Sequence, residues 1–345
     1  MHRPDVRIGH VTRRPVSRMF LAVATTCLLF LASGCGLLSG SEADEGGSGT
    51  GGLEKSKITV GTMPAIDVAP LHMAIQRGYF KEAGLEVELQ PIQGGAAGIP
   101  LLANGELDVT FGNWVSFFKA QQEQILDLKI VSDGYQADDG MFLTMTMPGN
   151  GVEKVSDLKD GKKKVAVNTR KNLNELSLIA AMQTRGVQPE DVEFVVMPFP
   201  DMPAALQRGD VQAASMIEPF ISQANQLGAK TLVDTATGPT ADIPIAGYAG
   251  TQKFVEENPK TAAAFQRVMT RAQTEASQDR AQVENVLPSY AKINEKTAAL
   301  VRLGVFPTTL EAGRLQRVAE LMQANGELPP NFQVEPLLFQ APPEN

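Results

Sequence analysis

The feature that most constrains the fold is one strand–helix pattern that occurs twice, about a hundred residues apart. Between residues 57 and 111, strand-like apolar runs alternate with amphipathic helical stretches, and the same order returns between residues 164 and 217. Strands that alternate with helices form parallel sheets, because each helix carries the chain back to the same end of the sheet. Residues 101–109 and 205–213 match best, since each ends a helix at a glycine and continues through an acid into a strand. The sequence therefore predicts two similar α/β lobes.

The segments around this repeat divide the rest of the chain. Residues 128–147 are rich in β-forming side chains and are suited to cross from one lobe to the other. After Thr251 the pattern changes to amphipathic helices, which are expected to pack on the lobes, and the chain ends in a proline-rich tail. We therefore expect lobe one at residues 57–134 plus about 236–345, and lobe two at residues 135–235.

The N-terminus predicts export and a lipid anchor. Residues 1–18 carry five arginines against one acid, and the apolar run at 19–31 is too short to span a bilayer comfortably. A basic segment, a short apolar run and small residues before a cysteine are typical of a lipoprotein signal peptide. We expect the signal peptide at residues 1–34 and the lipid on Cys35, at the start of a flexible tether over residues 35–56. A plain secretory signal is the alternative, and both Sec and twin-arginine export stay open.

Cysteine and histidine usage argues against an enzyme. The chain has two cysteines and three histidines. Cleavage of the expected signal peptide leaves His72 and the Cys35 that would carry the lipid. One histidine and no free thiol exclude His/Cys metal sites and Cys–His dyads, and neither a phosphate-binding loop nor a nucleophile-elbow motif occurs. We therefore predict no catalytic residue, no metal and no cofactor.

Charge argues against a nucleic-acid partner. The net charge is −8, and removal of the five arginines and one aspartate of the expected signal peptide leaves −12. No stripe of lysine and arginine stands out in the remaining chain. We expect a monomer that binds a small molecule and no nucleic acid.

The expected ligand site lies beyond the carboxyl ends of the strands, where open parallel sheets bind their ligands. Two lobes that face each other would close these strand ends over one cleft. Trp114, the only tryptophan, is either an apolar wall of this cleft or a core residue. Glu218 holds the equivalent place in lobe two, and its partner is either a cationic or amine ligand, or a helix N-terminus or hinge amide. The candidate ligand-binding residues are Thr62, Met63, Gln93, Gly94, Gly95, Asn113, Trp114, Asn168, Thr169, Met197, Glu218 and Phe220.

The same cleft also has features that suit an anion. Free backbone N–H groups are expected where residues 93–95 and 168–169 each precede a helix, and such groups favour negative charge. Ordinary capping by Asn and Thr is the alternative. Arg170 and Lys171 lie beside the second segment and either strengthen it or are solvated. A zwitterion would satisfy both the anion-suited and the cation-suited features of the cleft.

A series of short motifs resembles one known family. The motifs are residues 58–61, 69–74, 77–87, 94–95, 102–109 and 155–167. In this order they are similar to the nitrate/sulfonate/taurine-binding proteins of ABC importers, a group that includes the binders of thiamine-pyrimidine precursors (the SsuA/THI5-like domain). The last motif contains a small insertion relative to the usual family pattern.

The resemblance implies a type II periplasmic-binding fold, in which two βαβ lobes joined by a two-strand hinge, with C-terminal helices, close around a solute. It implies an extracytoplasmic, lipid-anchored protein that delivers a small polar organic solute to an ABC permease in the membrane. The alternatives are a binder of an aminopyrimidine thiamine precursor or another cationic or amine solute, and a ligand-binding receptor for a membrane sensor. Pyrimidine-synthase relatives share the fold but rely on an active-site histidine and a Cys-rich motif.

Overall fold

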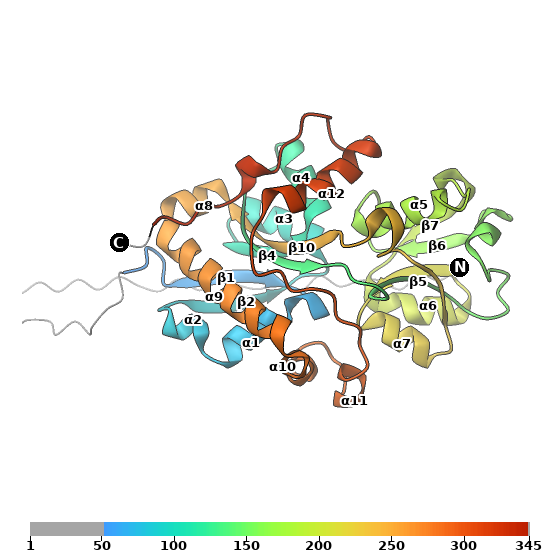
Figure 1. The fold of residues 1–345 in the computed structure, drawn as a ribbon, viewed down its shortest axis with the longest axis horizontal. Helices are drawn as coiled ribbons and strands as arrows, with labels where there is room; N and C mark the ends of the chain where they lie inside the picture. Colours follow the sequence, from blue (N-terminus) through green and yellow to red (C-terminus); the bar gives the residue numbers. More distant parts are fainter. Residues whose placement is uncertain (1–51, 344–345) are drawn as a thin grey trace, which may run out of the picture. The chain divides into compact units, whose positions relative to one another are not determined.

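The structure is a computed structural model that describes residues 52–343. The predicted signal peptide, Cys35 and most of the predicted tether lie outside these residues. The described residues all belong to one compact unit. Within the described part, the strands form two five-stranded sheets, and helices surround each sheet to make a lobe (Figure 1). This architecture confirms the predicted two-lobed α/β fold class.

The first sheet has the strand order β2-β1-β3-β10-β4. Its strands are β1 (Lys57–Thr62), β2 (Glu86–Pro91), β3 (Val109–Asn113), β4 (Leu128–Gln136) and β10 (Pro244–Thr251). β1, β2 and β3 run parallel, as the repeat predicts. β10 lies antiparallel between β3 and β4, so the complete sheet is mixed and not parallel throughout. The physical reason is that the chain returns from the second lobe and therefore enters the first sheet from the opposite end.

The second sheet repeats this arrangement with the order β7-β6-β8-β5-β9. Its strands are β5 (Phe142–Thr146), β6 (Lys164–Val167), β7 (Glu193–Val196), β8 (Ala213–Ile217) and β9 (Lys230–Asp234). Here β5 takes the antiparallel position beside β8 that β10 takes beside β3. The two lobes thus match in strand order as well as in sequence pattern.

Helices cover both sheets at positions close to those that the apolar spacing predicts. Around the first sheet they are α1 (Ala69–Gln76), α2 (Tyr79–Glu82), α3 (Gly95–Ala103), α4 (Trp114–Gln122), α8 (Gln252–Glu257), α9 (Pro259–Gln278), α10 (Arg280–Val286) and α12 (Ala312–Ala324). On the second lobe they are α5 (Leu173–Gln183), α6 (Met202–Arg208) and α7 (Phe220–Gln226). The helical stretch after β1 is divided at Gly78, whose φ of 75° is left-handed and interrupts the helix between α1 and α2.

Two segments connect the lobes. The first sheet extends through Gln136, two residues beyond the expected boundary, and the chain then passes to β5 through residues 137–141. It returns from β9 to β10 through residues 235–243. The two crossings contact each other, because the Ala137 N–H donates to the Ile243 carbonyl at 2.9 Å. A paired double crossing of this kind is suited to act as a hinge.

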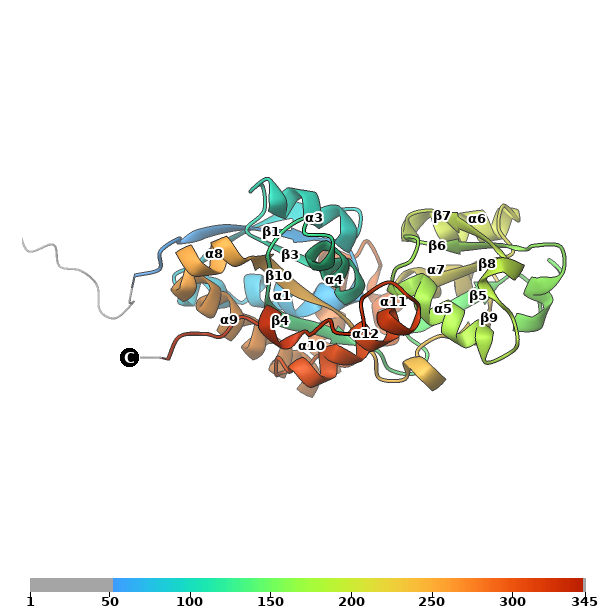
Figure 2. The same ribbon diagram turned by 90° about the horizontal axis from the view of Figure 1, so that it is seen from above.

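The C-terminal part of the chain packs mainly on the first lobe (Figure 2). α9 contacts α1 and β4, and α12 contacts α4 and β10. The short helix α11 (Glu295–Ala298) lies in the segment between α10 and α12. Near its end the chain reaches β4, where Leu338 forms a parallel bridge with Ile130. No helix within residues 52–343 combines the length and the apolar character needed to cross a membrane.

Candidate ligand-binding cleft

An inner cavity of about 50 Å³ lies between the two sheets. Both lobes contribute to its wall, because Met63 and Asn113 lie at strand ends of the first sheet, whereas Asn168 and Ile217 lie at strand ends of the second. Phe111, Phe142 and Phe199 make much of the remaining surface apolar. A cavity of this size holds a functional group or a few water molecules, not a whole organic solute.

A wider mouth of about 400 Å³ adjoins the inner cavity and shares Met63 and Phe199 with it. Its wall includes Gln93, Phe220 and Tyr290. The inner cavity and the mouth together provide a small recess for one group and a larger space for the body of a solute.

Eight of the twelve sequence-predicted residues line the inner cavity or the mouth. They are Thr62, Met63, Gln93, Gly94, Gly95, Asn113, Asn168 and Phe220. Trp114, Thr169, Met197 and Glu218 are absent from both linings. Position at a strand end therefore brings most of the predicted residues together in the structure.

Gly95 explains how the start of α3 reaches the cavity. A Cβ at this position would lie 2.6 Å from the Gly112 Cα and 2.9 Å from the Asn113 nitrogen. A larger residue would push α3 away from the end of β3, because both contacts are to backbone. Glycine thus allows the backbone of the helix start to pack directly on the strand end.

Two buried polar atoms of the lining have no hydrogen-bond partner among the described residues. They are the Thr62 Oγ1 in the mouth and the Asn168 Oδ1 in the inner cavity. Buried polar groups in folded proteins are nearly always paired. Two unpaired atoms in one cleft indicate that the cleft is built to pair with a molecule that carries polar groups.

Trp114 lies in the core of the first lobe. Its side chain is fully buried, and its ring stacks on Phe118 with 6.4 Å between ring centroids. The ring also lies against β10, where a Cβ at Gly247 would meet the Trp114 Cη2 at 2.2 Å. Of the two roles considered from the sequence, this placement corresponds to the core residue and not to a wall of the cleft.

Glu218 is also buried outside both cavities. Its carboxylate accepts hydrogen bonds from the Ser222 N–H at 3.1 Å, from the Ser222 Oγ at 3.0 Å and from the Arg302 N–H at 3.3 Å. Burial raises the pKa of Glu218, although these hydrogen bonds oppose the rise. The partners of the carboxylate are therefore Ser222, at the start of α7, and the backbone N–H of Arg302, in the C-terminal segment. Glu218 thus joins lobe two to the C-terminal segment.

The two cations beside residues 168–169 are engaged in ion pairs. The Arg170 Nε lies 2.9 Å from the Glu175 Oε2, and the guanidinium lies over the Phe194 ring. The Lys171 Nζ lies 3.0 Å from the Glu327 Oε1. Neither side chain lines the inner cavity, and the cation that lines the adjoining mouth is Lys292.

Asp67 is a lining residue that sequence reasoning missed. It precedes α1 between two buried apolar residues, it is 5% exposed, and it faces the inner cavity. Burial raises the pKa of Asp67 to about 7, and the partner of its carboxylate is its own backbone N–H. The available signal was an acid inside the otherwise apolar stretch that begins the first predicted helix.

His72 forms part of the wall of the mouth. Its ring stacks on Tyr290 with 3.7 Å between centroids and an angle of 3° between the planes. Burial lowers the pKa of His72 to about 4, so the ring is neutral at pH 7. The stacked pair presents a flat, uncharged surface to the mouth.

Contacts between the lobes hold the cleft closed in this structure. The Asn172 Nδ2 donates to the Ser116 Oγ at 2.8 Å across a buried part of the lobe interface. Glu327 accepts from Lys119 of the first lobe at 2.7 Å and from Lys171 of the second at 3.0 Å. Burial raises the pKa of Glu327, but the two lysines outweigh this effect and the pKa is lowered. These contacts form beside a site to which both lobes contribute.

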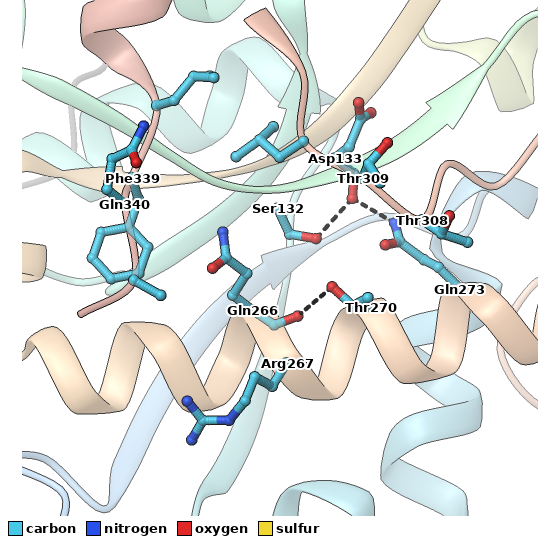
Figure 3. Close-up of a pocket in the computed structure, with 13 residues that line it drawn as sticks. Ser132, Asp133, Gln266, Arg267, Thr270, Gln273, Thr308, Thr309, Phe339 and Gln340 are labelled. Atoms are coloured by element: carbon cyan, nitrogen blue, oxygen red, sulfur yellow. Dashed lines mark hydrogen bonds between the residues drawn. The ribbon is translucent and has the colours of Figure 1, made fainter. Parts of the chain in front are cut away.

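A separate hollow of about 470 Å³ lies on the first lobe (Figure 3). β4 contributes Ser132 and Asp133, and α9 and the C-terminal segment supply other walls, with Gln273 directed toward the Asp133 backbone. The hollow contains none of the sequence-predicted residues, and one lobe supplies its whole lining. A molecule bound there would not bridge the lobes, so we place the candidate site in the cleft between them.

Comparison with known proteins agrees with this geometry. Residues 51–287, well over half of the chain, match the NMT1-like family. The chain belongs to this family. This membership confirms the family resemblance that the ordered motifs predict.

Family relatives are named as binding proteins and not as enzymes. A taurine-binding periplasmic protein of Escherichia coli (strain K12) is 25% identical over 222 residues, which cover 63% of this chain and 65% of that protein. The match thus spans just under two thirds of that relative's length. A Bacillus subtilis (strain 168) protein named for binding aliphatic sulfonates is 27% identical over 298 residues, or 79% of this chain and 83% of that protein.

A solved structure shows the same fold. The alkanesulfonate-binding protein SsuA from Xanthomonas axonopodis pv. citri, bound to MOPS, superposes with a TM-score of 0.70 at 16% identity. The similarity covers 83% of this chain and 99% of that one. The two-lobed architecture is therefore the periplasmic-binding fold that the resemblance implies.

Proposed function

We propose that this NMT1-like protein is a lipid-anchored, extracytoplasmic solute-binding protein that delivers a small polar organic solute to an ABC importer. The observation that carries the proposal is the inner cavity, to which both sheets contribute and in which a buried Asn168 oxygen has no partner among residues 52–343. A solute that touches both lobes stabilises the closed arrangement, because it gains contacts there that the open form lacks. The closed form is then the species that a permease recognises.

The proposed solute class follows from the relatives and from the site. The relatives are named for taurine and for aliphatic sulfonates, which are small polar organic molecules. The mouth and inner cavity have room for a solute of that size, with the stacked His72–Tyr290 pair and Phe199 as flat walls. These features support solute capture without a catalytic group.

A thermal-shift experiment tests the binding function. The whole protein, purified in detergent, is heated alone and with taurine, ethanesulfonate, nitrate or 4-amino-2-methylpyrimidine. A true solute at about a hundred times its Kd should stabilise the folded state by about 2.7 kcal/mol, because it binds the native chain and not the unfolded one. A melting temperature unchanged by all four compounds would count against this solute class.

The proposed anchor predicts a change of location. Replacement of Cys35 by serine removes the sulfur that would carry the lipid. The variant should move from the membrane fraction to the soluble extracytoplasmic fraction, because no other anchor is proposed. Fractionation followed by immunoblotting measures the shift, with a Ser33→Ala variant as the control that keeps the cysteine. Retention of the Cys35→Ser protein in the membrane fraction would contradict lipid anchoring.

A further inference from the structure

The inner cavity contains a carboxylate that no cation neutralises. Asp67 is 95% buried, lines the cavity and forms no ion pair with any residue in the range 52–343. No lysine, arginine or histidine of the described chain lines the inner cavity. Burial of a carboxylate without a partner costs folding free energy, so such groups in folded proteins are usually paired. The missing partner is therefore expected to be a group of positive charge that arrives with a ligand.

Three buried tyrosines interact electrostatically with Asp67, and none of them neutralises it. The Tyr290 hydroxyl donates to the Ala65 carbonyl at 3.0 Å, while the Tyr135 oxygen accepts from the Gly304 N–H at 2.5 Å. The Tyr248 hydroxyl, on β10, has no hydrogen-bond partner among the described residues. Burial and then the charge of Asp67 raise the pKa of all three phenols, which stay neutral and leave the carboxylate without a cation.

A second acceptor faces the same space from the other lobe. The buried Asn168 Oδ1 has no partner within the described residues, and it contributes to the same wall as Asp67. The pair therefore offers acceptors from both lobes, and the surrounding wall is largely apolar. A group with several N–H donors would satisfy both residues at once.

We propose that Asp67 and Asn168 form a subsite for a cationic nitrogen group of the solute, such as a protonated amine. The inference rests on the proposed solute-binding function and specifies which chemical group the inner cavity selects. The 50 Å³ cavity fits such a group, and the adjoining 400 Å³ mouth accepts the rest of the molecule. Since Asp67 belongs to lobe one and Asn168 to lobe two, the nitrogen group contacts both lobes and favours closure.

Matched pairs of probes test the subsite. Isothermal titration calorimetry with the whole protein in detergent at pH 8 compares taurine with ethanesulfonate, which lacks the amine, and 4-amino-2-methylpyrimidine with 2-methylpyrimidine. The amino-bearing member of at least one pair should bind at least about tenfold more tightly, because it alone donates charged or strongly polarised N–H bonds to Asp67. Asp67→Asn should lower that affinity by about a hundredfold, since the amide keeps the size of the side chain and removes its charge.

Dependence on pH separates a ligand contact from a structural role. Taurine keeps its ammonium between pH 6 and pH 8, whereas Asp67, whose pKa burial raises to about 7, loses its charge toward pH 6. Affinity for the wild-type protein should therefore fall by about tenfold from pH 8 to pH 6, and the Asp67→Asn variant should show no such dependence. Asp133→Asn is the matched control, because Asp133 is an equally buried aspartate outside the cleft with a pKa of about 7.

Each outcome decides the inference. Equal affinity within both pairs, or an Asp67→Asn protein that binds the amino-bearing probe as wild type does, overturns the subsite and leaves the proposed solute-binding function standing. If none of the four probes binds, the subsite as stated and the proposed solute class both fail. A selective loss in Asp67→Asn but not in Asp133→Asn supports the subsite.

Discussion

Replacement of Trp114 by alanine is expected to lower the free energy of unfolding by about 3–5 kcal/mol, because it leaves a cavity in the core of the first lobe. The indole is fully buried between α4 and β10 and packs on Phe117, Phe118 and the backbone of Gly247. Urea unfolding followed by circular dichroism measures the loss. The Nε1–H has no partner among the described residues, so replacement by phenylalanine should cost much less than replacement by alanine.

The same variants distinguish a core role from a ligand contact. If Trp114 were a wall of the cleft, alanine would weaken solute binding while the stability of the empty protein changed little. From its placement we expect the reverse: reduced stability, with near-normal affinity in the fraction that remains folded. A Trp114→Ala protein with the same melting temperature as the wild type would contradict the assignment of Trp114 to the core.

Whereas Trp114→Ala should lower the free energy of unfolding, Asp67→Asn should raise it. Burial raises the pKa of Asp67 from 3.8 to about 7, so between these values the folded chain binds more protons than the unfolded chain. Stability from this group is therefore present at low pH and is lost as the pH rises from about 4 through 7. Above pH 7 the ionised carboxylate destabilises the empty protein, and asparagine should restore roughly 2–4 kcal/mol at pH 8.

Asp133 provides the contrast within the same lobe. Burial also raises the pKa of Asp133 to about 7, but its carboxylate pairs with Arg314. Asp133→Asn should therefore destabilise the protein, because it leaves the guanidinium without its counterion. Thermal melts of both variants at pH 5 and pH 8 test the pair of expectations. An Asp67→Asn protein no more stable than wild type at pH 8 would show that the ionised Asp67 carboxylate does not destabilise the empty protein.

Prediction from sequence was strongest where the pattern is local. The alternation of strands and helices depends on neighbouring residues, so both parallel three-strand units and most of their helices could be predicted. The antiparallel placement of β10 and β5 in the sheets could not, because it depends on how the chain crosses between lobes. Val305 and Leu338 likewise reach β4 from distant parts of the sequence.

For the candidate site, the sequence predicts where a residue lies in the sheet better than it predicts what its side chain contacts. A strand end determines which edge of a sheet a residue occupies, and this rule located eight of the cleft residues. It does not determine the direction of a side chain or its partners. Trp114 is buried by Gly247 of β10, and Glu218 is paired with the Arg302 N–H, both contributed by segments far along the chain. Asp67 was missed because it begins a helix and does not end a strand.

The C-terminal segment has a consequence for the solubility of the body. β4 is an outer strand of the first sheet, and the free backbone of such a strand is a template on which another chain can add. Here the protein's own chain occupies that position, through the Leu338 bridge to Ile130, the Phe339 N–H bond to the Ile130 carbonyl at 2.9 Å, and the Val305 bridge to Gln136. The proline-rich tail, although irregular, thus covers part of the edge strand β4 and hinders another chain from pairing with it.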